Sequence, residues 1–171
     1  MNADQQDWDR ARALCESGVL SAVQRVGFPS IWTREDNDLD LHFAGPGGLR
    51  TFSVGVKSGN GATDLKIVDG SSRDLFFAKW QDYSVDEIAE AMASWEEVAE
   101  TGVDWAIGSV LSQPQRIEMT SHYRATVGFS FACLRDGVAM GRLVLFAESD
   151  LIFIAREEDP GVAGFALRPI V

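Results

Sequence analysis

Short runs of alternating apolar and polar residues, separated by tight turns, restrict the fold of this chain more than any other feature. In segments 39–43 and 51–57 every second residue is apolar, and the segment 45–48 between them reads Gly-Pro-Gly-Gly. Alternation with a period of two is typical of half-buried strands, and glycine with proline favours a turn. Further apolar runs at 65–68 and 75–80 extend the pattern, so we predict a meander of about four strands.

A second strand-rich part begins near residue 123. We predict strands at 123–134, 138–147, 151–155 and 165–167, with Arg135-Asp136-Gly137 as a hairpin turn after the first. Because short turns join successive strands, antiparallel pairing is favoured.

Two segments have helical spacing. Residues 4–26 carry apolar side chains near one face, with Gly18 as a possible break, and residues 84–101 begin with the capping box Ser84 and Glu87. Residues 103–111 suggest a further helical turn that ends before Pro114. We therefore predict one α+β domain spanning residues 1–171, in the order helix, meander, helix, meander. Both main helices are expected to pack on one face of an antiparallel meander sheet, or of two sheets that meet.

The charge balance is strongly acidic. The 171 residues include 26 acids and 15 bases, which gives a net charge of −11. Such a charge repels nucleic acid and anionic membranes, so we expect neither as a direct partner. No apolar stretch approaches the roughly 20 residues that cross a membrane. Two distant cysteines and a start without a signal-peptide pattern lead us to expect reduced thiols and a cytoplasmic protein.

The strongest candidate site is a run of acids without a base between residues 82 and 104. Like-charged residues four apart in a helix each cost about 0.2–0.5 kcal/mol, and acids near a helix C-terminus are unfavourable. A helix selected only for stability usually alternates its charges, so we interpret the run as a face that binds a basic protein. A solvated face, or one neutralised by the chain's own arginines, is the alternative. The predicted partner-binding residues are Asp82, Asp86, Glu87, Glu90, Glu96, Glu97, Glu100, Asp104 and Trp105.

Metal and cofactor sites are not predicted. Asp36, Asp38 and Asp40 have the spacing of the first calcium ligands of an EF-hand loop, but Leu41 and Gly47 stand where that loop needs glycine and glutamate. Neither histidine belongs to a zinc motif, and the glycine-rich turns match no phosphate-binding loop.

We therefore expect a non-enzymatic acidic domain that covers a basic surface on a protein partner. In composition and predicted architecture it resembles bacterial immunity proteins, toxin inhibitors and secretion chaperones, and mimicry of nucleic acid is a sharper version of the same hypothesis. The alternative is a small-molecule-binding protein or enzyme with a pocket between sheet and helices. Its candidate lining residues are His42, His122, Tyr123, Arg124 and Cys133. A third hypothesis is a module that assembles with its own copies.

Overall fold

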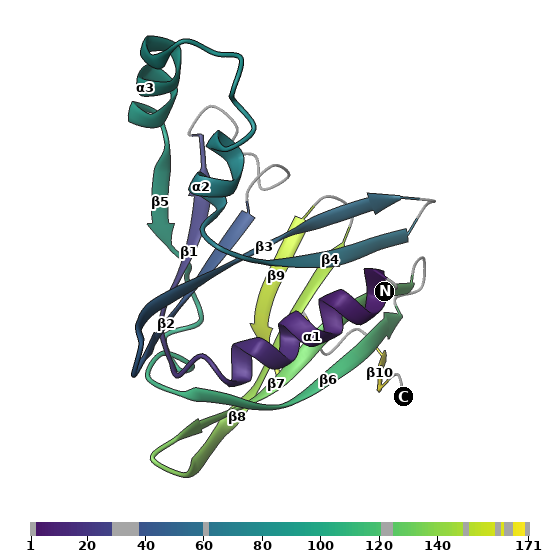
Figure 1. Cartoon of the computed structure of the whole chain (residues 1–171). Coiled ribbons are helices and arrows are strands. Elements are labelled where there is room, and N and C mark those ends of the chain that lie inside the picture. Colours follow the sequence, from purple (N-terminus) through teal and green to yellow (C-terminus); the bar gives the residue numbers. More distant parts are fainter. Residues whose placement is uncertain are drawn as a thin grey trace.

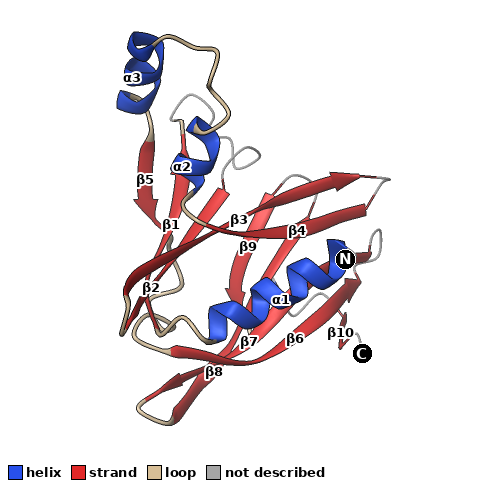
Figure 2. Ribbon diagram, viewed as in Figure 1, coloured by secondary structure: helices blue, strands red, loops and turns tan. Residues whose placement is uncertain are grey.

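The computed structural model describes residues 3–28, 38–59, 62–120, 125–148, 151–159, 162 and 166–169. These residues form an α+β protein dominated by an antiparallel sheet (Figure 2). In chain order the elements are α1 (Ala3–Cys15), β1 (Val19–Gly27), β2 (Asp38–Gly45), β3 (Gly48–Gly59), β4 (Ala62–Asp69), α2 (Ser72–Phe77), α3 (Val85–Ala93), β5 (Glu96–Ala99), β6 (Val110–Thr120), β7 (Ala125–Arg135), β8 (Val138–Glu148), β9 (Leu151–Arg156) and β10 (Ala166–Pro169).

The strands form one sheet that closes on itself. Its order is β10-β6-β1-β2-β3-β4-β7-β8-β9, and β5 pairs with β1 outside this path. Among the described strands every pairing is antiparallel except that of β4 with β7, which meet at the single parallel pair of Asp64 and Val127. Because β6 pairs with both β1 and β7, strands β1, β2, β3, β4, β7 and β6 make a ring.

Helix α1 lies across this ring between β4 and β6 (Figure 1). Its Ala11 and Leu14 are fully buried, and its Trp8 stacks on Phe129 of β7 with 6.1 Å between ring centroids. The main hydrophobic core contains this apolar side of α1, buried residues of the sheet, and Val103 and Ala106 from the turns before β6. Apolar side chains of α1 therefore form part of the core that the ring of strands surrounds.

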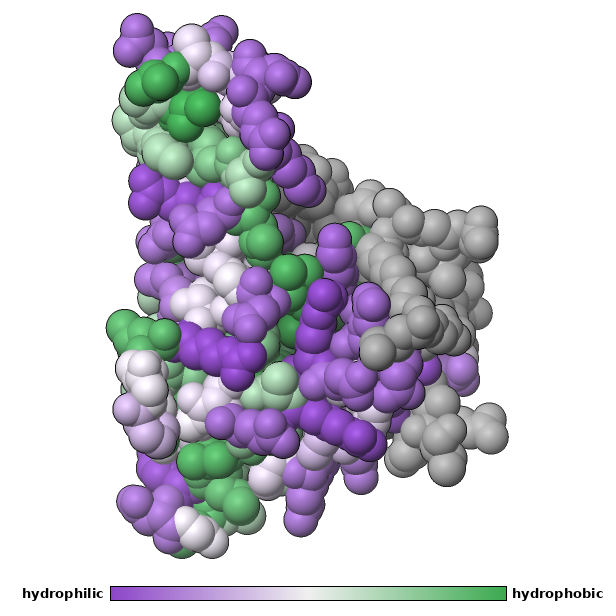
Figure 3. Space-filling model, viewed as in Figure 1, coloured by the Kyte–Doolittle hydropathy of each residue, from purple (hydrophilic) through white to green (hydrophobic). Residues whose placement is uncertain are grey.

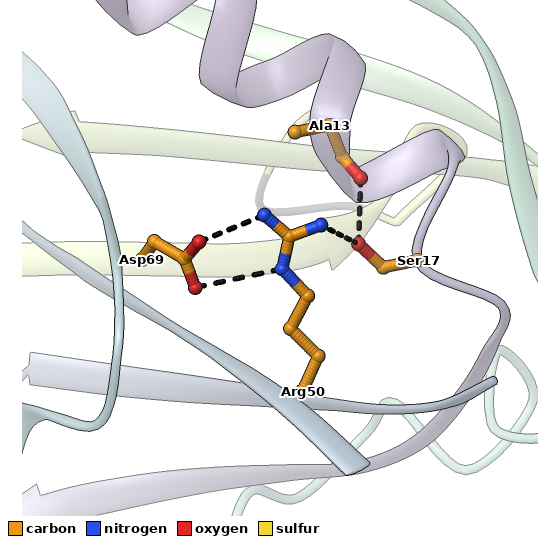
Figure 4. A network of polar contacts seen from close by, with 4 residues as sticks. All are labelled: Ala13, Ser17, Arg50 and Asp69. Carbon is orange, nitrogen blue, oxygen red and sulfur yellow. Dashed lines mark hydrogen bonds and ion pairs between the residues drawn. The ribbon is translucent and has the colours of Figure 1, made fainter. Parts of the chain in front are cut away.

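A polar network holds the turn between α1 and β1 (Figure 4). The Ser17 hydroxyl donates to the Ala13 carbonyl at 2.6 Å, and Arg50 of β3 donates to the Ser17 hydroxyl at 3.4 Å and pairs with Asp69 at 2.7 Å. The next residue, Gly18, has a φ of +103° and lies so close to the β2 backbone that a Cβ would overlap a carbonyl oxygen there. This tight crossing ends the helix and starts the first strand.

The predicted helix at residues 4–26 is wrong beyond Cys15, because residues 19–27 form β1. A register shift between Leu20 and Ala22 interrupts the regular alternation, and the buried apolar residues are Leu20, Val23 and Val26. A spacing of three residues imitates one face of a helix. This irregularity in the strand explains the incorrect helical assignment.

The predicted helix at residues 84–101 is too long. Its capping box is confirmed, since Ser84 and Glu87 exchange hydrogen bonds, but α3 ends at Ala93 and residues 96–99 pair with β1 as β5. Acids near a helix C-terminus are unfavourable, whereas pairing with β1 satisfies the backbone groups of this segment. Two main helices on one face are not observed: α1 packs against β4 and β6, and no residue of α3 is buried.

Two further segments differ from the prediction. Residues 75–80, expected as a strand, belong to α2 and the turn after it. Residues 104–108 form turns with hydrogen bonds between residues three apart, as expected for part of 103–111, but β6 already begins at Val110. Pro114 disfavours a central strand because it lacks an N–H group. The strand accommodates it in a register shift between Ser112 and Gln115, where Gln113 has a φ of +47°. The turns at 45–48 and 135–137 are confirmed.

Candidate partner-binding site

Residues 71–99 form a projection that we call the acidic arm. It comprises α2, α3 and β5 and extends from the sheet beside the end of β1 (Figures 1 and 2). The arm holds seven acids and two bases. All four residues of β5 are exposed, and α3 has no buried residue. The arm therefore presents most of its surface to solvent.

A buried carboxylate fixes α2, and with it the start of the arm, to the sheet. Asp40 of β2 is 1% exposed and accepts hydrogen bonds from the Ser72 N–H at 3.0 Å and from the Ser72 hydroxyl at 2.5 Å. The Ser53 hydroxyl of β3 lies 2.7 Å from that of Ser72. Burial raises the pKa of Asp40, and the hydrogen bonds from Ser72 partly offset this rise. A carboxylate at the first N–H groups of a helix is favourable, so Asp40 anchors α2.

Six of the predicted acids lie on the arm, and all six side chains are exposed. They are Asp82, Asp86, Glu87, Glu90, Glu96 and Glu97. Within the part of the chain that the structure describes, none of the six forms an ion pair with a base. Their carboxylates are therefore open to a partner.

The other two predicted acids lie outside the arm. Glu100 follows β5 and pairs with Arg25 of β1 at 2.6 Å, and the two side chains are 17% and 18% exposed. Arg25 also donates to the Ile152 carbonyl of β9 at 3.1 Å. Glu100 is thus neutralised within the fold and joins the base of the arm to the sheet, whereas Asp104 is exposed in the turn that follows.

Trp105 is half-buried and packs against the main core. The guanidinium carbon of Arg156 lies 4.9 Å from the centroid of its ring. The chain's own arginine therefore covers part of the aromatic surface that was predicted to meet a partner.

An aromatic cluster at the arm was not predicted from the sequence. Trp80 and Tyr83 have ring centroids 4.6 Å apart, and Phe28 and Trp95 have centroids 5.2 Å apart. The cluster consists of rings from three places: the end of β1, α2, and the segments around α3. Its members are Phe28, Phe76, Phe77, Trp80, Tyr83 and Trp95. The available signal was the three- to four-residue spacing of Phe76, Trp80 and Tyr83, which is typical of one helix face.

A shallow cleft of about 450 Å³ opens beside this cluster. Phe28, Trp80 and Tyr83 supply aromatic walls, Glu87 and Glu90 of α3 supply carboxylates, and Ala91 and Ser94 complete the lining. Figure 3 shows hydrophobic side chains gathered on the arm next to hydrophilic ones. The cleft thus combines flat apolar surfaces with negative charge.

The residues of the alternative pocket give little support for catalysis. Residues 122–124 lie outside the described part of the chain. The ring nitrogens of His42 lie 2.8 Å from a threonine hydroxyl of β3 and 2.7 Å from a glutamine side-chain oxygen of β1. Cys133 is fully buried in the main core, and burial raises the pKa of its thiol to about 11. A thiol with this pKa stays protonated at neutral pH and is a poor nucleophile.

Among the residues that the structure places, no group of three or more His, Cys, Asp or Glu side chains is arranged to hold a metal ion. Asp36 lies outside those residues. Asp38 is on β2, where burial and the nearby Asp40 raise its pKa to about 6. None of the described helices is long and apolar enough to span a membrane.

Comparison with known proteins gives no assignment: no protein-family model, no curated protein and no solved structure matches the chain.

Proposed function

We propose that this chain is a non-enzymatic binding protein whose acidic arm covers a basic surface on a protein partner. The observation that carries the proposal is the set of six exposed carboxylates on the arm, none of them paired with a base among the described residues. Gathered like charges cost stability in the free protein, and a basic partner relieves that cost. Charge complementarity of this kind also speeds association.

The arm also carries apolar side chains of the kind that anchor interfaces. Tyr83, Val85 and Val98 are 53%, 82% and 50% exposed. Protein interfaces commonly combine a few aromatic or aliphatic anchors with a polar rim. The arm has both components within residues 83–98.

Three kinds of basic partner fit this surface: a toxin that the protein inhibits, a secreted protein that it escorts, and a nucleic-acid-binding protein whose site it occupies. The net charge of −11 disfavours nucleic acid itself as the ligand. The two cysteines are free, as in proteins of a reducing compartment, and we place the protein in the cytoplasm.

The test uses two matched double variants of the full chain. The arm variant carries Glu90→Lys and Glu97→Lys. The control variant carries Asp9→Lys and Glu16→Lys, which replace exposed acids in α1 and just after its C-terminal end. Each Asp or Glu to Lys replacement adds two charge units, so both variants take the net charge from −11 to −7. A partner captured from the source cells with the unmodified chain is then measured against each variant.

We expect the partner to have a basic surface, the complex to weaken steeply as salt rises from about 50 to 500 mM, and the arm variant alone to lose binding. A salt-insensitive complex, or equal binding by the two variants, would rule out docking through the arm.

A further inference from the structure

We infer that the cleft beside the aromatic cluster is an arginine-binding site, which takes one guanidinium group of the basic partner. The side chain would lie against Trp80 and Tyr83, with Glu87 and Glu90 as its counter-charges. This inference rests on the proposed function, because it names the group of the partner that the arm receives.

The aromatic walls offer ring surface to a flat cation: Trp80 and Tyr83 pack against each other, so the cation would lie on an outer ring face. The rings of Trp80 and Tyr83 are tilted by 33° with centroids 4.6 Å apart, and Tyr83 is 53% exposed. Phe28, which also lines the cleft, is held by edge contacts with Phe77 and Trp95. A cation within about 6 Å of such a ring is attracted by its quadrupole, and tryptophan and tyrosine are the stronger partners.

The carboxylates are held on the same side of α3. Glu87 and Glu90 are three residues apart and therefore neighbours on one helix face. The Ser84 N–H and hydroxyl both donate to Oε2 of Glu87, at 2.8 and 2.9 Å. These bonds fix the side chain and lower its pKa, while Oε1 accepts no hydrogen bond from the described residues. Glu87 thus offers an oriented negative charge without further ordering.

Other ligand classes fit the cleft less well. An anion would be repelled by both carboxylates, and a neutral apolar group would remove water from them without giving a new partner. A lysine ammonium is a compact, strongly hydrated charge, whereas guanidinium is planar, weakly hydrated, and able both to stack on a ring and to donate two parallel hydrogen bonds. An arginine side chain can therefore contact the aromatic rings and the carboxylates of the cleft at the same time.

The direct test is titration of the full chain with the peptide acetyl-Gly-Arg-Gly-amide, followed by the nitrogen-15 indole signals of the tryptophans. The control peptide carries citrulline, which keeps the shape of arginine and lacks its charge. We expect saturable shifts of the Trp80 signal, assigned by its loss in Trp80→Phe, and at least tenfold weaker binding of the citrulline peptide. Equal binding of the two peptides, or no shift at Trp80, would overturn the inference.

Matched variants separate the cleft from the general negative field. Tyr83→Ala and Glu90→Gln should each weaken the arginine peptide about three- to fivefold, which is the size of an exposed cation–π contact or one exposed charge contact. Tyr83→Phe keeps the ring and Glu97→Gln removes the same charge outside the cleft, so both should stay within about twofold. Thermal melting of each variant checks folding. A loss in Glu97→Gln equal to that in Glu90→Gln would overturn the cleft as the site.

The two proposals fail in different ways. If Tyr83→Ala keeps full affinity for the captured partner while Glu90→Lys with Glu97→Lys loses it, the arginine site is wrong and the binding function stands. If the arginine peptide binds in the cleft but the Glu90→Lys with Glu97→Lys variant keeps full affinity for the captured partner, the binding function is wrong and the arginine site stands.

Discussion

Replacing Glu100 with glutamine tests whether this acid serves the fold rather than the partner. Glu100 and Arg25 are 2.6 Å apart, and each side chain is more than four-fifths covered. Glutamine keeps the shape and one acceptor oxygen but leaves the guanidinium without its counter-charge. Hydrogen bonds to charged groups contribute about 1.5–3 kcal/mol, and since part of the bond survives, we expect a loss of about 1.5–2 kcal/mol in the free energy of unfolding. For a chain of this size that lowers the melting temperature by about 3–8 °C.

Urea unfolding followed by tryptophan fluorescence measures this loss. Glu97→Gln is the matched control, because it removes the same charge from an exposed residue of β5 and should change stability by less than about 0.5 kcal/mol. The Glu100→Gln loss should persist in about 1 M salt, since a pair that is largely covered by protein is poorly screened. Equal losses in the two variants, or none in Glu100→Gln, would refute the assignment of Arg25 and Glu100 as the ion pair that joins the base of the arm to the sheet.

Three further predictions concern stability and thiol chemistry. The pKa of Asp38 is raised from 3.8 to about 6, so the folded protein binds a proton at this carboxyl more tightly than the unfolded chain does. The stability that this proton contributes is present below about pH 4 and is lost as pH rises through 6. Asp38→Asn removes the charged form and should therefore stabilise the protein at pH 8. The pKa shift corresponds to about 3 kcal/mol, which partial exposure of the side chain reduces to about 1–2 kcal/mol, and the gain at pH 4 should be far smaller. Equal effects in urea unfolding at the two pH values would contradict this. Gly18→Ala should destabilise by about 2–3 kcal/mol, because Gly18 has a positive φ and touches the β2 backbone, whereas Gly47→Ala, with open space around it, should be nearly neutral in the same assay. Burial raises the pKa values of Cys15 and Cys133 to about 11, so a thiol reagent at pH 7.5 should react slowly with the native chain and rapidly in urea; fast labelling of the native chain would be inconsistent with the packing.

Where local sequence alone dictates structure, the prediction was accurate. The alternation at 39–43 and 51–57, the Gly-Pro-Gly-Gly turn between these runs, and the capping box at Ser84 all appear in the structure. Each of these depends on residues within a few positions of one another. The assignment of residues 1–171 to a single domain stays a prediction.

The errors arise where distant residues decide the outcome. β1 has a register shift that changes which side chains are buried, and β6 accommodates Pro114 in a bulge; both depend on neighbouring strands. α2 starts where Asp40, more than thirty positions earlier, accepts hydrogen bonds from Ser72. None of these pairings can be read from local periodicity.

The candidate site shows the same division. The sequence identifies the acids as a charged run, but the role of each acid depends on the side chain that it contacts in the fold. Glu97 faces solvent and Glu100 meets Arg25, although the two are three residues apart. The apolar run at 75–80 predicts a strand, and a strand would separate Trp80 from Phe76 and Phe77, which it contacts in the structure; read in this way, the sequence gives no sign of the aromatic cleft.

The rate of association with the captured partner tests the central claim most directly, because steering by a local charged surface acts on that rate. In about 50 mM salt, Glu90→Lys with Glu97→Lys should slow association more than tenfold relative to Asp9→Lys with Glu16→Lys, and the two rates should converge near 500 mM salt. Equal rates for the two variants at low salt would show that only net charge matters and that the acidic arm is not the docking surface.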